Sequence, residues 1–363
     1  MNNINIIAFY LPQYHPTEDN NKWWGEGFTE WTNVAKAKRL FPGHYQPKIP
    51  ADLGFYDLRI PEVRIKQAEL AKEAGVTAFC YYHYWFGNGK QELELPFNEV
   101  VKTGEPDFPF CLCWANETWY AKFWNKDGTA SKKPLVEQKY LGEEDNKLHF
   151  HTLLSAFSDH RYLRIDGRLV FVIYHPFDFP DFQSFKLQWN NLAKENGLPE
   201  FYFIAQVYDG YDVDEVKKLG YDAVNLLHLM HLPTYHQTRK KILFKIKTWL
   251  KIPFIISYKK LTKDYLTRED YREDVFPSMM PNWDHTPRST YGGAVLHGST
   301  PELFKQHAEM VLRVVNQKEK NSRVVFLKSW NEWGEGNYME PDLRFGKGYI
   351  KALKEAKVKI LGK

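Results

Sequence analysis

The chain has 363 residues, with 49 Lys and Arg against 45 Asp and Glu, a formal net charge of +4 and 43% hydrophobic residues. This length suits one large α/β domain such as a barrel with insertions, and the small net charge argues against a nucleic-acid-binding protein. Aromatic residues are many, with 12 Trp, 22 Tyr and 25 Phe, and several stand among polar residues, where a ring can stack on a sugar.

The cysteines and the N-terminus bear on the cellular compartment. Cys80, Cys111 and Cys113 lie in apolar, strand-like runs, and their odd number and expected burial predict free thiols in a reducing compartment. The N-terminal stretch MNNINIIAFYLPQYHP has no basic start and no long apolar run, and no later window has the length of a spanning helix. We therefore expect a cytoplasmic protein.

Short apolar runs alternate with amphipathic stretches along the chain, which is typical of a parallel sheet wrapped by helices. The predicted strands, in chain order, are 5–10, 76–82, 108–114, 169–174, 201–206, 223–227, 275–280 and 324–327. The predicted helices are 61–73, 148–157, 182–195 and 301–315, the last with Ser299 and Thr300 as candidate caps. The pattern predicts an α/β fold, a (β/α)8 TIM barrel with elaborated βα loops, as one domain over 1–363 with an insertion at about 229–270.

Most of the predicted strands are apolar through their bodies and end in Tyr, His, Trp, Asn or Glu. In a barrel the C-terminal ends of all strands meet at the face that holds the active site, whereas a doubly wound sheet gathers such residues mainly at its switch point. For any single His or Tyr an ordinary packing role explains the position equally well, so the argument depends on the repetition. The residues expected to bind substrate are Tyr10, Gln13, His15, Trp24, Glu30, Tyr82, Tyr84, Trp85, Trp114, Asn116, Glu117, Tyr174, His175, Gln206, Trp283, Asp284, Arg288, Trp330, Asn331 and Trp333.

The stretch 324–342, which reads VVFLKSWNEWGEGNYMEPD, is the part around which the rest of the chain is organised. Its apolar start suits a buried strand that delivers the following polar residues to the rim of the barrel. Glu332 and Glu335 stand three residues apart among Trp residues, and Gly334 and Gly336 let the backbone turn sharply. Cleavage of a glycosidic bond requires one group to protonate the leaving oxygen and one to act at the sugar. We therefore predict Glu332 and Glu335 as the catalytic pair.

Other assignments compete with this one. An exposed acidic loop with a Trp that plugs the barrel end also explains 324–342. Glu117, in a second Asn-Glu flanked by Trp, is the main rival for a catalytic carboxylate. His83 and His175 lack the acidic cluster that would complete a metal site, and the sequence has no Gly-rich phosphate loop after a strand and no Gly-x-Ser-x-Gly elbow. We expect neither a metal nor an organic cofactor.

Several long motifs resemble one family. They are AFYLPQYHP, WWGEGFTEW, YYHYWFGNGK, CWANETW, FPSMMPNWDHTPR and SWNEWGEG with Glu-Pro beyond it. They resemble the WbsX-like proteins, which occur among bacterial surface-polysaccharide biosynthesis proteins, are commonly labelled glycosyltransferases, and are related to the endo-α-mannosidases of glycoside hydrolase family 99. The resemblance covers residues 6–341 and implies a (β/α)8 barrel. It also implies catalytic roles for Glu332 and Glu335, which match the two Glu of the family 99 motif Asn-Glu-Trp-x-Glu-Gly.

The resemblance implies a particular mechanism. Glu332 would act as a base on the sugar's own 2-hydroxyl, which attacks the anomeric carbon to give a strained anhydro sugar, while Glu335 would protonate the leaving oxygen and later activate the acceptor. This route gives net retention and requires a hydroxyl trans to the leaving group, as in α-mannosides and α-rhamnosides. The middle of the chain is WbsX-like rather than mannosidase-like, so the implied mechanism carries over better than the substrate.

Three functions follow from these observations. The carboxylate pair favours hydrolysis or transglycosylation of an oligosaccharide or polysaccharide, which is lipid-linked in one version. The family resemblance implies that this reaction belongs to O-antigen or capsule metabolism. A true glycosyltransferase that uses a nucleotide sugar or a lipid-linked sugar is the alternative within the enzymes, although a barrel is unusual for that class. A barrel that binds glycans without catalysis is the third, and the presence of both Glu332 and Glu335 argues against it.

A basic segment at 239–260, RKKILFKIKTWLKIPFIISYKK, holds eight Lys or Arg and no Asp or Glu. It can be an ordinary insertion whose apolar side packs on the barrel, because barrel helices are amphipathic too. Alternatively, basic and apolar residues together attract a protein to anionic lipid, with about 1 kcal/mol for each Lys or Arg near the surface. The segment therefore also predicts peripheral contact with the inner face of the plasma membrane, through Lys240, Lys241, Lys245 and Lys247 among others.

Overall fold

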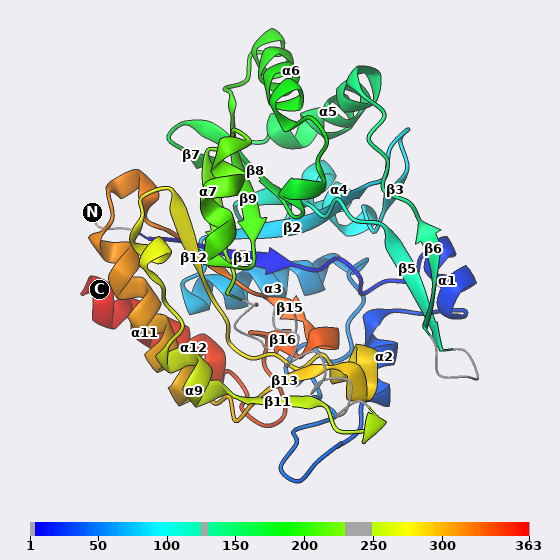
Figure 1. The fold of residues 1–363 in the computed structure, drawn as a ribbon, viewed down its shortest axis with the longest axis vertical. Helices are drawn as coiled ribbons and strands as arrows, with labels where there is room; N and C mark the ends of the chain where they lie inside the picture. Colours follow the sequence, from blue (N-terminus) through cyan, green and yellow to red (C-terminus); the bar gives the residue numbers. More distant parts are fainter. Residues whose placement is uncertain (1–3, 125–129, 229–248, 363) are drawn as a thin grey trace.

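Eight parallel strands close into a barrel in the computed structural model, which describes residues 4–124, 130–228 and 249–362 (Figure 1). Each barrel strand pairs with the next along the chain, and the last returns to pair with the first. The strands are β1 (Asn5–Tyr10), β2 (Ala78–Trp85), β4 (Phe110–Trp114), β8 (Arg168–Ile173), β9 (Phe201–Val207), β10 (Ala223–Leu226), β12 (Val275–Met279) and β14 (Val324–Leu327). The predicted (β/α)8 barrel and all of its strands are confirmed.

Helices cover the outside of the barrel between the strands (Figure 1). They are α3 (Pro61–Ala74), α4 (Leu95–Thr103), α5 (Glu143–Phe157), α6 (Phe182–Glu195), α7 (Val213–Lys218), α11 (Pro301–Gln317) and α12 (Gly348–Leu361). The four predicted helices correspond to α3, α5, α6 and α11, and the Thr300 side chain caps α11 by accepting from the Leu303 backbone N–H. The helices α4, α7 and α12 are not among the predicted ones, and the first two are too short for a clear helical period.

Side chains along each barrel strand alternate between the interior and the helix layer, as the strand period of two requires. Phe9 stacks on Tyr82 and Phe326 from the two neighbouring strands, with ring centroids 5.5 and 5.2 Å apart, so it faces the interior. Tyr10, the next residue, points outward and donates its hydroxyl to Gln67 of α3 at 2.6 Å. This alternation decides which residues near a strand end can reach a site at the barrel mouth.

Most of the additional elements follow the C-terminal ends of the strands, where α1, α2, β5 and β6 lie together on the right of Figure 1. They are α1 (Glu18–Trp24), α2 (Glu30–Lys36), β3 (Gln91–Glu92), β5 (Trp119–Trp124), β6 (Ala130–Val136), β7 (Arg164–Ile165), β11 (Phe254–Ser257), α9 (Tyr258–Lys263), α10 (Thr286–Ser289), β13 (Ala294–His297), β15 (Asn331–Glu332) and β16 (Asn337–Tyr338). Of these, β5 pairs with β6 and β15 with β16 in antiparallel fashion, and β11 pairs with β13 in parallel. The loops are therefore elaborated mainly on the face where a barrel enzyme holds its site.

Two further features concern burial and membranes. Cys80, Cys111 and Cys113 are free and buried, as predicted. Within the described ranges, no helix has both the length and the apolar character that crossing a bilayer requires. Of the predicted basic segment, 239–248 falls outside the described residues, and with it Lys240, Lys241, Lys245 and Lys247.

Candidate active site

A cavity of ≈ 590 Å³ opens at the C-terminal face of the barrel. Its lining combines the strand ends with α1, α2 and α10 of the surrounding loops. The predicted catalytic pair and eight predicted substrate-binding residues line it, namely Glu332, Glu335, Gln13, Trp24, Glu30, Tyr82, Tyr84, Glu117, Tyr174 and Arg288. The fold thus brings nearly half of the predicted site into one space.

The turn after β14 places the two glutamates on that cavity. Glu332 ends the short strand β15, and Glu335 ends the single helical turn Trp333–Glu335. Gly336 follows with φ +55, a left-handed conformation that glycine adopts without strain. A Cβ at Gly334 would overlap the carboxylate of Glu30, so a larger residue there would force the Glu30 side chain out of its place beside Arg288.

Two hydrogen bonds hold this turn from behind. The backbone N–H of Asp284 donates to the Glu335 carbonyl at 2.7 Å, and the Lys48 ammonium donates to the Gly336 carbonyl at 2.9 Å. The stacked rings of Trp333 and Tyr338, 3.7 Å apart at their centroids, fill the space beneath. The position of both carboxylates is therefore set by packing and hydrogen bonds on either side of the turn.

Arg288 bridges the carboxylates of the cavity. Its Nη1 lies 2.5 Å from Oε1 of Glu335 and 3.5 Å from Oε1 of Glu332, and its Nε donates to Glu30 at 3.0 Å. Lys328 supplies a second cation, 3.3 Å from Oε2 of Glu332. One guanidinium and one ammonium thus offset the charge of the buried acids, which would otherwise repel one another strongly.

The surroundings separate the pKa values of the two glutamates. Burial, followed by the charge of Glu335, raises the pKa of Glu332, and Lys328 and Arg288 offset part of this rise. Burial also acts upward on the pKa of Glu335, but Arg288 and His285 outweigh it and hold that pKa well below its usual range. In the structure Glu335 is therefore the carboxylate that stays ionised, and Glu332 is the one that more readily holds a proton.

Trp85 and Trp114 require a correction, because their positions do not fit the expectation that they line sugar subsites. Both are almost fully buried and pack on His149 of α5, with ring centroids 4.5 and 4.8 Å away. Trp114 donates its indole N–H to the Trp85 carbonyl at 3.0 Å. They lie on the outward-facing positions of β2 and β4, and they belong to the layer between barrel and helices.

Several other predicted residues hold the loops rather than line the cavity. Asn331 exchanges two hydrogen bonds with the Leu11 backbone, at 2.8 and 3.0 Å. Asn116 does the same with the His175 backbone, at 2.8 and 2.9 Å. Those that are buried away from the cavity in such packing or anchoring roles are Tyr10, His15, Asn116, Asp284, Trp330, Asn331 and Trp333.

The remaining predicted residues line smaller neighbouring pockets. His175 and Gln206 line a pocket of ≈ 140 Å³, and Trp283 lines one of ≈ 240 Å³. His175 also contacts the carboxylate of Glu117, with its Nε2 3.3 Å away. They surround the cavity without contributing to its wall.

Lys328 and His285, which contact the two glutamates, are not among the residues predicted from the sequence. Lys328 directly follows the apolar run of β14, where one basic residue after four buried ones is a usable signal. His285 lies in the motif that also supplies Trp283 and Arg288, and its Nε2 is 3.5 Å from Oε1 of Glu335. Within the described part of the chain, no group of three His, Cys, Asp or Glu side chains is placed to hold a metal ion.

Two solved structures share this fold over nearly the whole chain. The GH99 endo-alpha-mannosidase from Bacteroides thetaiotaomicron is 14% identical, with a TM-score of 0.54, and the match covers 99% of this chain and 98% of that one. A glycoside hydrolase-like protein is 16% identical, with a TM-score of 0.59, and the match covers 97% and 93%. At such low identity the likeness shows the fold alone.

Sequence relatives place the chain in a family. The uncharacterized protein WxcX of Xanthomonas campestris pv. campestris is 35% identical over 356 residues, which are 97% of this chain and 49% of WxcX. This chain therefore spans about half the length of the curated relatives it matches. The family model described as Glycosyltransferase WbsX matches residues 6–353. The chain belongs to the WbsX glycosyltransferase family.

Proposed function

We propose that this chain is a carbohydrate-active enzyme that cleaves or transfers glycosidic bonds with net retention, on substrates of α-mannoside or α-rhamnoside type. The observation that carries the proposal is that Glu332 and Glu335 line one cavity under the same guanidinium, that of Arg288. Two carboxylates whose surroundings push their pKa values apart are suited to act as acid and base at one bond.

In the proposed reaction Glu332 takes the proton of the sugar's 2-hydroxyl while that oxygen attacks the anomeric carbon. Glu335 gives a proton to the departing oxygen, so the glycosidic bond breaks as the anhydro ring forms. In the second half, Glu335 takes a proton from water or from an acceptor hydroxyl, which attacks the anomeric carbon, and Glu332 returns the proton to the 2-oxygen. Two displacements at the same carbon give net retention.

The pKa directions favour a second assignment, with the roles exchanged. Arg288 keeps Glu335 ionised, whereas burial favours a proton on Glu332. Under the first assignment, substrate must draw Arg288 away from Glu335 before that residue can act as an acid. Under the second, Glu332 protonates the leaving oxygen directly and Glu335 acts as the base.

A leaving group that needs no proton separates the two assignments. With a dinitrophenyl glycoside, replacing the acid by Ala leaves bond cleavage nearly intact, whereas replacing the base abolishes it. Glu335→Ala is expected to keep cleavage of this substrate under the first assignment, and Glu332→Ala under the second. The comparison of both variants on activated and unactivated glycosides decides between them.

The cavity wall suits a glycan. Tyr82, Tyr84, Tyr174 and Trp119 line it beside the charged groups, and Trp24 stands at its exposed edge. Aromatic faces pack on the apolar faces of sugar rings while charged and polar groups bond the hydroxyls. We propose an oligosaccharide or polysaccharide of bacterial surface-glycan metabolism as the substrate.

A nucleotide-sugar transferase is the rival enzyme, and one segment bears on it. Asp212, Val213 and Asp214 have the Asp-x-Asp spacing that a metal-dependent transferase can use. Asp214 is ion-paired with Arg272 at 2.5 Å, which favours a structural role. Product analysis tests the rivals together: turnover of synthetic α-mannosides or α-rhamnosides supports the proposal, turnover of nucleotide sugars alone overturns it, and glycan binding without any turnover supports a binding barrel.

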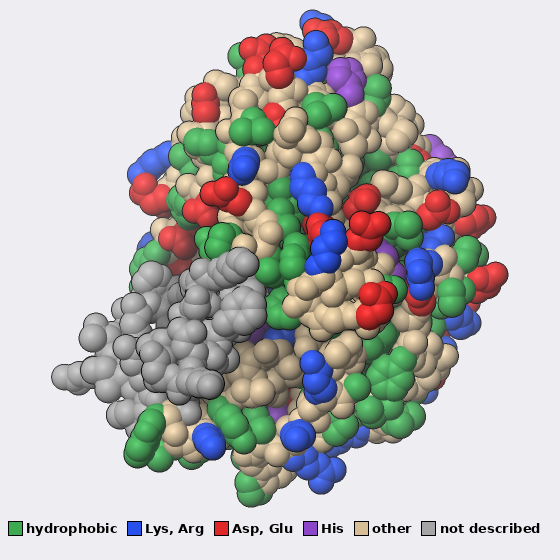
Figure 2. Space-filling view, turned by 90° about the vertical axis from the view of Figure 1, so that its right-hand side faces the viewer, with side chains coloured by type: hydrophobic (Ala, Val, Ile, Leu, Met, Phe, Trp, Pro, Cys, Tyr) green, Lys and Arg blue, Asp and Glu red, His purple; other side chains and the backbone are tan. Residues whose placement is uncertain are grey.

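We also propose that a lipid-linked substrate would be met at the inner face of the membrane. In the described part of the predicted basic segment, Trp249 and Leu250 are 81% and 52% exposed. On the face drawn in Figure 2, basic and acidic side chains are interspersed. Cosedimentation with anionic vesicles at low salt tests the contact: Trp249→Ser is expected to reduce binding, and Tyr211→Ser, which changes another exposed ring, is expected to leave it unchanged.

A further inference from the structure

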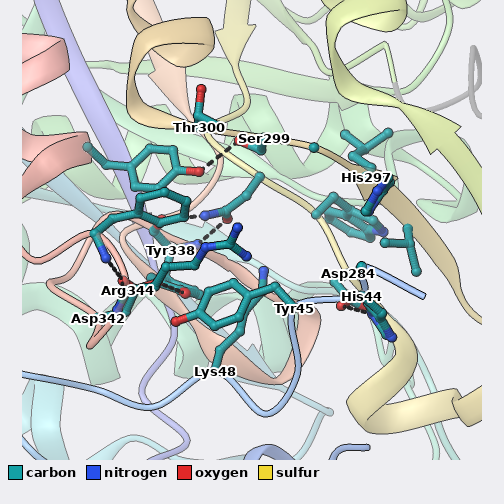
Figure 3. A pocket seen from close by; sticks show the side chains of 18 residues that line it. His44, Tyr45, Lys48, Asp284, His297, Ser299, Thr300, Tyr338, Asp342 and Arg344 are labelled. Carbon is teal, nitrogen blue, oxygen red and sulfur yellow. Dashed lines mark hydrogen bonds and ion pairs between the residues drawn. The ribbon is translucent and has the colours of Figure 1, made fainter. Parts of the chain in front are cut away.

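A second pocket, drawn in Figure 3, has a volume of ≈ 240 Å³. It lies beside the cavity of Glu332 and Glu335. Segments 43–48, 282–300 and 338–349 form it, and they follow β1, β12 and β14. Trp283 faces this pocket, whereas His285, two residues later, lines the larger cavity. The two cavities are therefore neighbours with separate linings.

Lys48 is a buried cation of this pocket. Only 7% of the residue is exposed, and its ammonium donates to the Gly336 carbonyl at 2.9 Å and lies 5.2 Å from the centre of the Tyr338 ring. An ammonium has three N–H donors, so this bond leaves two of them for another partner. Among the described residues, no carboxylate lies within ion-pair distance of Lys48.

Arg344 is the second cation, and it stands at the mouth. Its guanidinium rests on the rings of Tyr45 and Phe345, 4.7 and 5.1 Å from their centres, and it forms no ion pair with any described carboxylate. Figure 3 shows Lys48 and Arg344 with their charged ends toward the middle of the pocket, and His297 at its opposite side. The pocket thus offers donors from several directions.

The acidic groups of the pocket are already occupied. Asp284 and Asp342 line it, and hydrogen bonds at both oxygens of each carboxylate tie them to the surrounding loops. The donors are His44, Gln46 and Thr286 for Asp284, and the Tyr338 hydroxyl with the backbone N–H groups of Arg344 and Phe345 for Asp342. What the pocket leaves for a ligand is mainly donors, which favours a ligand rich in acceptors.

The place of the pocket in the fold also favours an anionic ligand. In (β/α)8 barrels, phosphate sites are frequent at the loops after the seventh and eighth strands, which here are β12 and β14. The N-termini of α11 and α12 meet beside it, since a Cβ at Gly348 would overlap the ring of Pro301. Each helix start contributes a partial positive charge and favours an anion.

We propose that this pocket binds a phosphoryl group through Lys48 and Arg344, either that of a phosphorylated glycan or sugar phosphate, or free phosphate. Donors on the floor, at the mouth and on the far side suit a tetrahedral group, whereas a planar carboxylate would be satisfied by the fork of Arg344 alone. The site goes beyond the proposed function, because it depends on none of the chemistry of Glu332 and Glu335.

Calorimetric titration of the full chain with inorganic phosphate, mannose 1-phosphate and glucuronate tests this. Both phosphates are expected to bind, and Arg344→Ala is expected to raise their dissociation constants about tenfold. Lys351→Ala, which removes an exposed lysine of α12 outside the pocket, is the matched control and is expected to change nothing. Lys48→Met is expected to weaken binding at least as much, but Lys48 also holds Gly336, so Arg344→Ala is the decisive variant.

The remaining outcomes are equally specific. Glu332→Gln is expected to bind phosphate as the unchanged chain does, so a failure of the proposed function would leave this result intact. Tighter binding of mannose 1-phosphate than of phosphate identifies a phosphorylated sugar as the source, and equal binding identifies free phosphate. The proposal is overturned if neither phosphate binds at millimolar concentration, if Arg344→Ala has no effect, or if glucuronate binds better than both.

Discussion

Two Asn-Glu segments at the barrel mouth are anchored alike. Asn331 exchanges both amide hydrogen bonds with the backbone of Leu11, after β1, and Asn116 does so with the backbone of His175, after β8. In each case the Asn ties its own strand end to the loop of the neighbouring strand. The glutamate that follows is therefore delivered to the same face of the barrel by the same device.

What surrounds each glutamate differs. Glu332 is buried between Arg288 and Lys328, whereas Glu117 is exposed and contacts only the ring of His175, at 3.3 Å, among the described residues. A buried carboxylate with charged neighbours acquires a shifted pKa, and an exposed one is screened by water. The comparison teaches that the Asn-Glu pattern provides the position, and the neighbouring charges provide the chemistry.

Neutralising each carboxylate in turn is the most direct test of the difference between Glu332 and Glu117. Glu332→Gln and Glu335→Gln are each expected to lower turnover of an unactivated glycoside by roughly 10² to 10⁴, since each removes one acid or base group. Glu117→Gln is the matched control and is expected to retain most activity. Steady-state rates together with a check of sugar binding measure this, and a loss for Glu117→Gln as large as for the pair would make Glu117 the catalytic carboxylate.

The buried and the exposed Trp residues near the two segments are expected to differ in their effect on stability. Trp85→Ala and Trp114→Ala are each expected to lower the free energy of unfolding by about 3 to 5 kcal/mol, because they leave cavities in the layer beneath α5. Trp24→Ala is expected to keep stability and to weaken glycan binding about threefold to tenfold, because its ring stands at the cavity edge. Denaturant unfolding and glycan titration on all three variants distinguish core from site. If the Trp85 and Trp114 variants were stable but lost glycan binding, both residues would belong to the binding site and not to the core.

Arg288 sets the pKa difference that the comparison depends on. Arg288→Met removes the cation that holds the pKa of Glu335 low, so that pKa rises and the acidic limb of the kcat/KM profile moves to higher pH. The basic limb of the profile, which reports Glu332, is expected to shift less, because Arg288 lies farther from Glu332 than from Glu335. We also expect activity to fall about 10²-fold. Arg59→Met, an exposed arginine paired with Asp57, is the control, and a profile unchanged in Arg288→Met would contradict the assigned cause.

The smallest expected effect concerns Glu340, which lies behind the Glu332 turn and accepts from the indole of Trp333 at 2.6 Å. Burial raises the pKa of Glu340 to about 7, against its ordinary value of 4.5, and hydrogen bonds oppose the rise. Its contribution to stability is therefore full below pH 4.5 and is lost as the pH rises through about 7.

Between pH 5 and pH 8 the free energy of unfolding is accordingly expected to fall less in Glu340→Gln than in the unchanged chain, by about 1 to 3 kcal/mol. Denaturant unfolding at both pH values measures the difference. Equal slopes in Glu340→Gln and the unchanged chain would show that Glu340 does not titrate in this range.

Strand positions follow from the sequence because each barrel strand is a short apolar run with polar residues at its end. The phase of each strand is harder to predict. The period of two separates Tyr82 and Tyr84, which face the cavity, from Trp85, which does not, but sequence alone does not tell which set faces inward. Residues chosen for their type alone therefore include members of the wrong face, as Trp85 and Trp114 show.

The ion pairs of Arg288 cannot be predicted from the sequence, for another reason. Arg288 and Glu335 are separated by 47 residues, and Arg288 and Glu30 by 258. Their contact depends on the path of three loops across the barrel mouth, and loop paths have no periodic signal. Lys328 is the exception, because a lone cation directly after a buried strand signals a charged partner nearby.

The closure of the barrel between β14 and β1 also decides when this site can form. Asn331 bonds to Leu11 across 320 residues of chain, and Tyr14 donates to the Asn331 carbonyl across 317. A chain leaving the ribosome exposes β1 long before β14 has been made, so the edge of β1 that later pairs with β14 stays unpaired until then. Contacts of such high sequence separation form late in folding. The turn that carries Glu332 and Glu335 can therefore take its shape only late in folding. Any chain that shows full activity has already closed the barrel between β14 and β1.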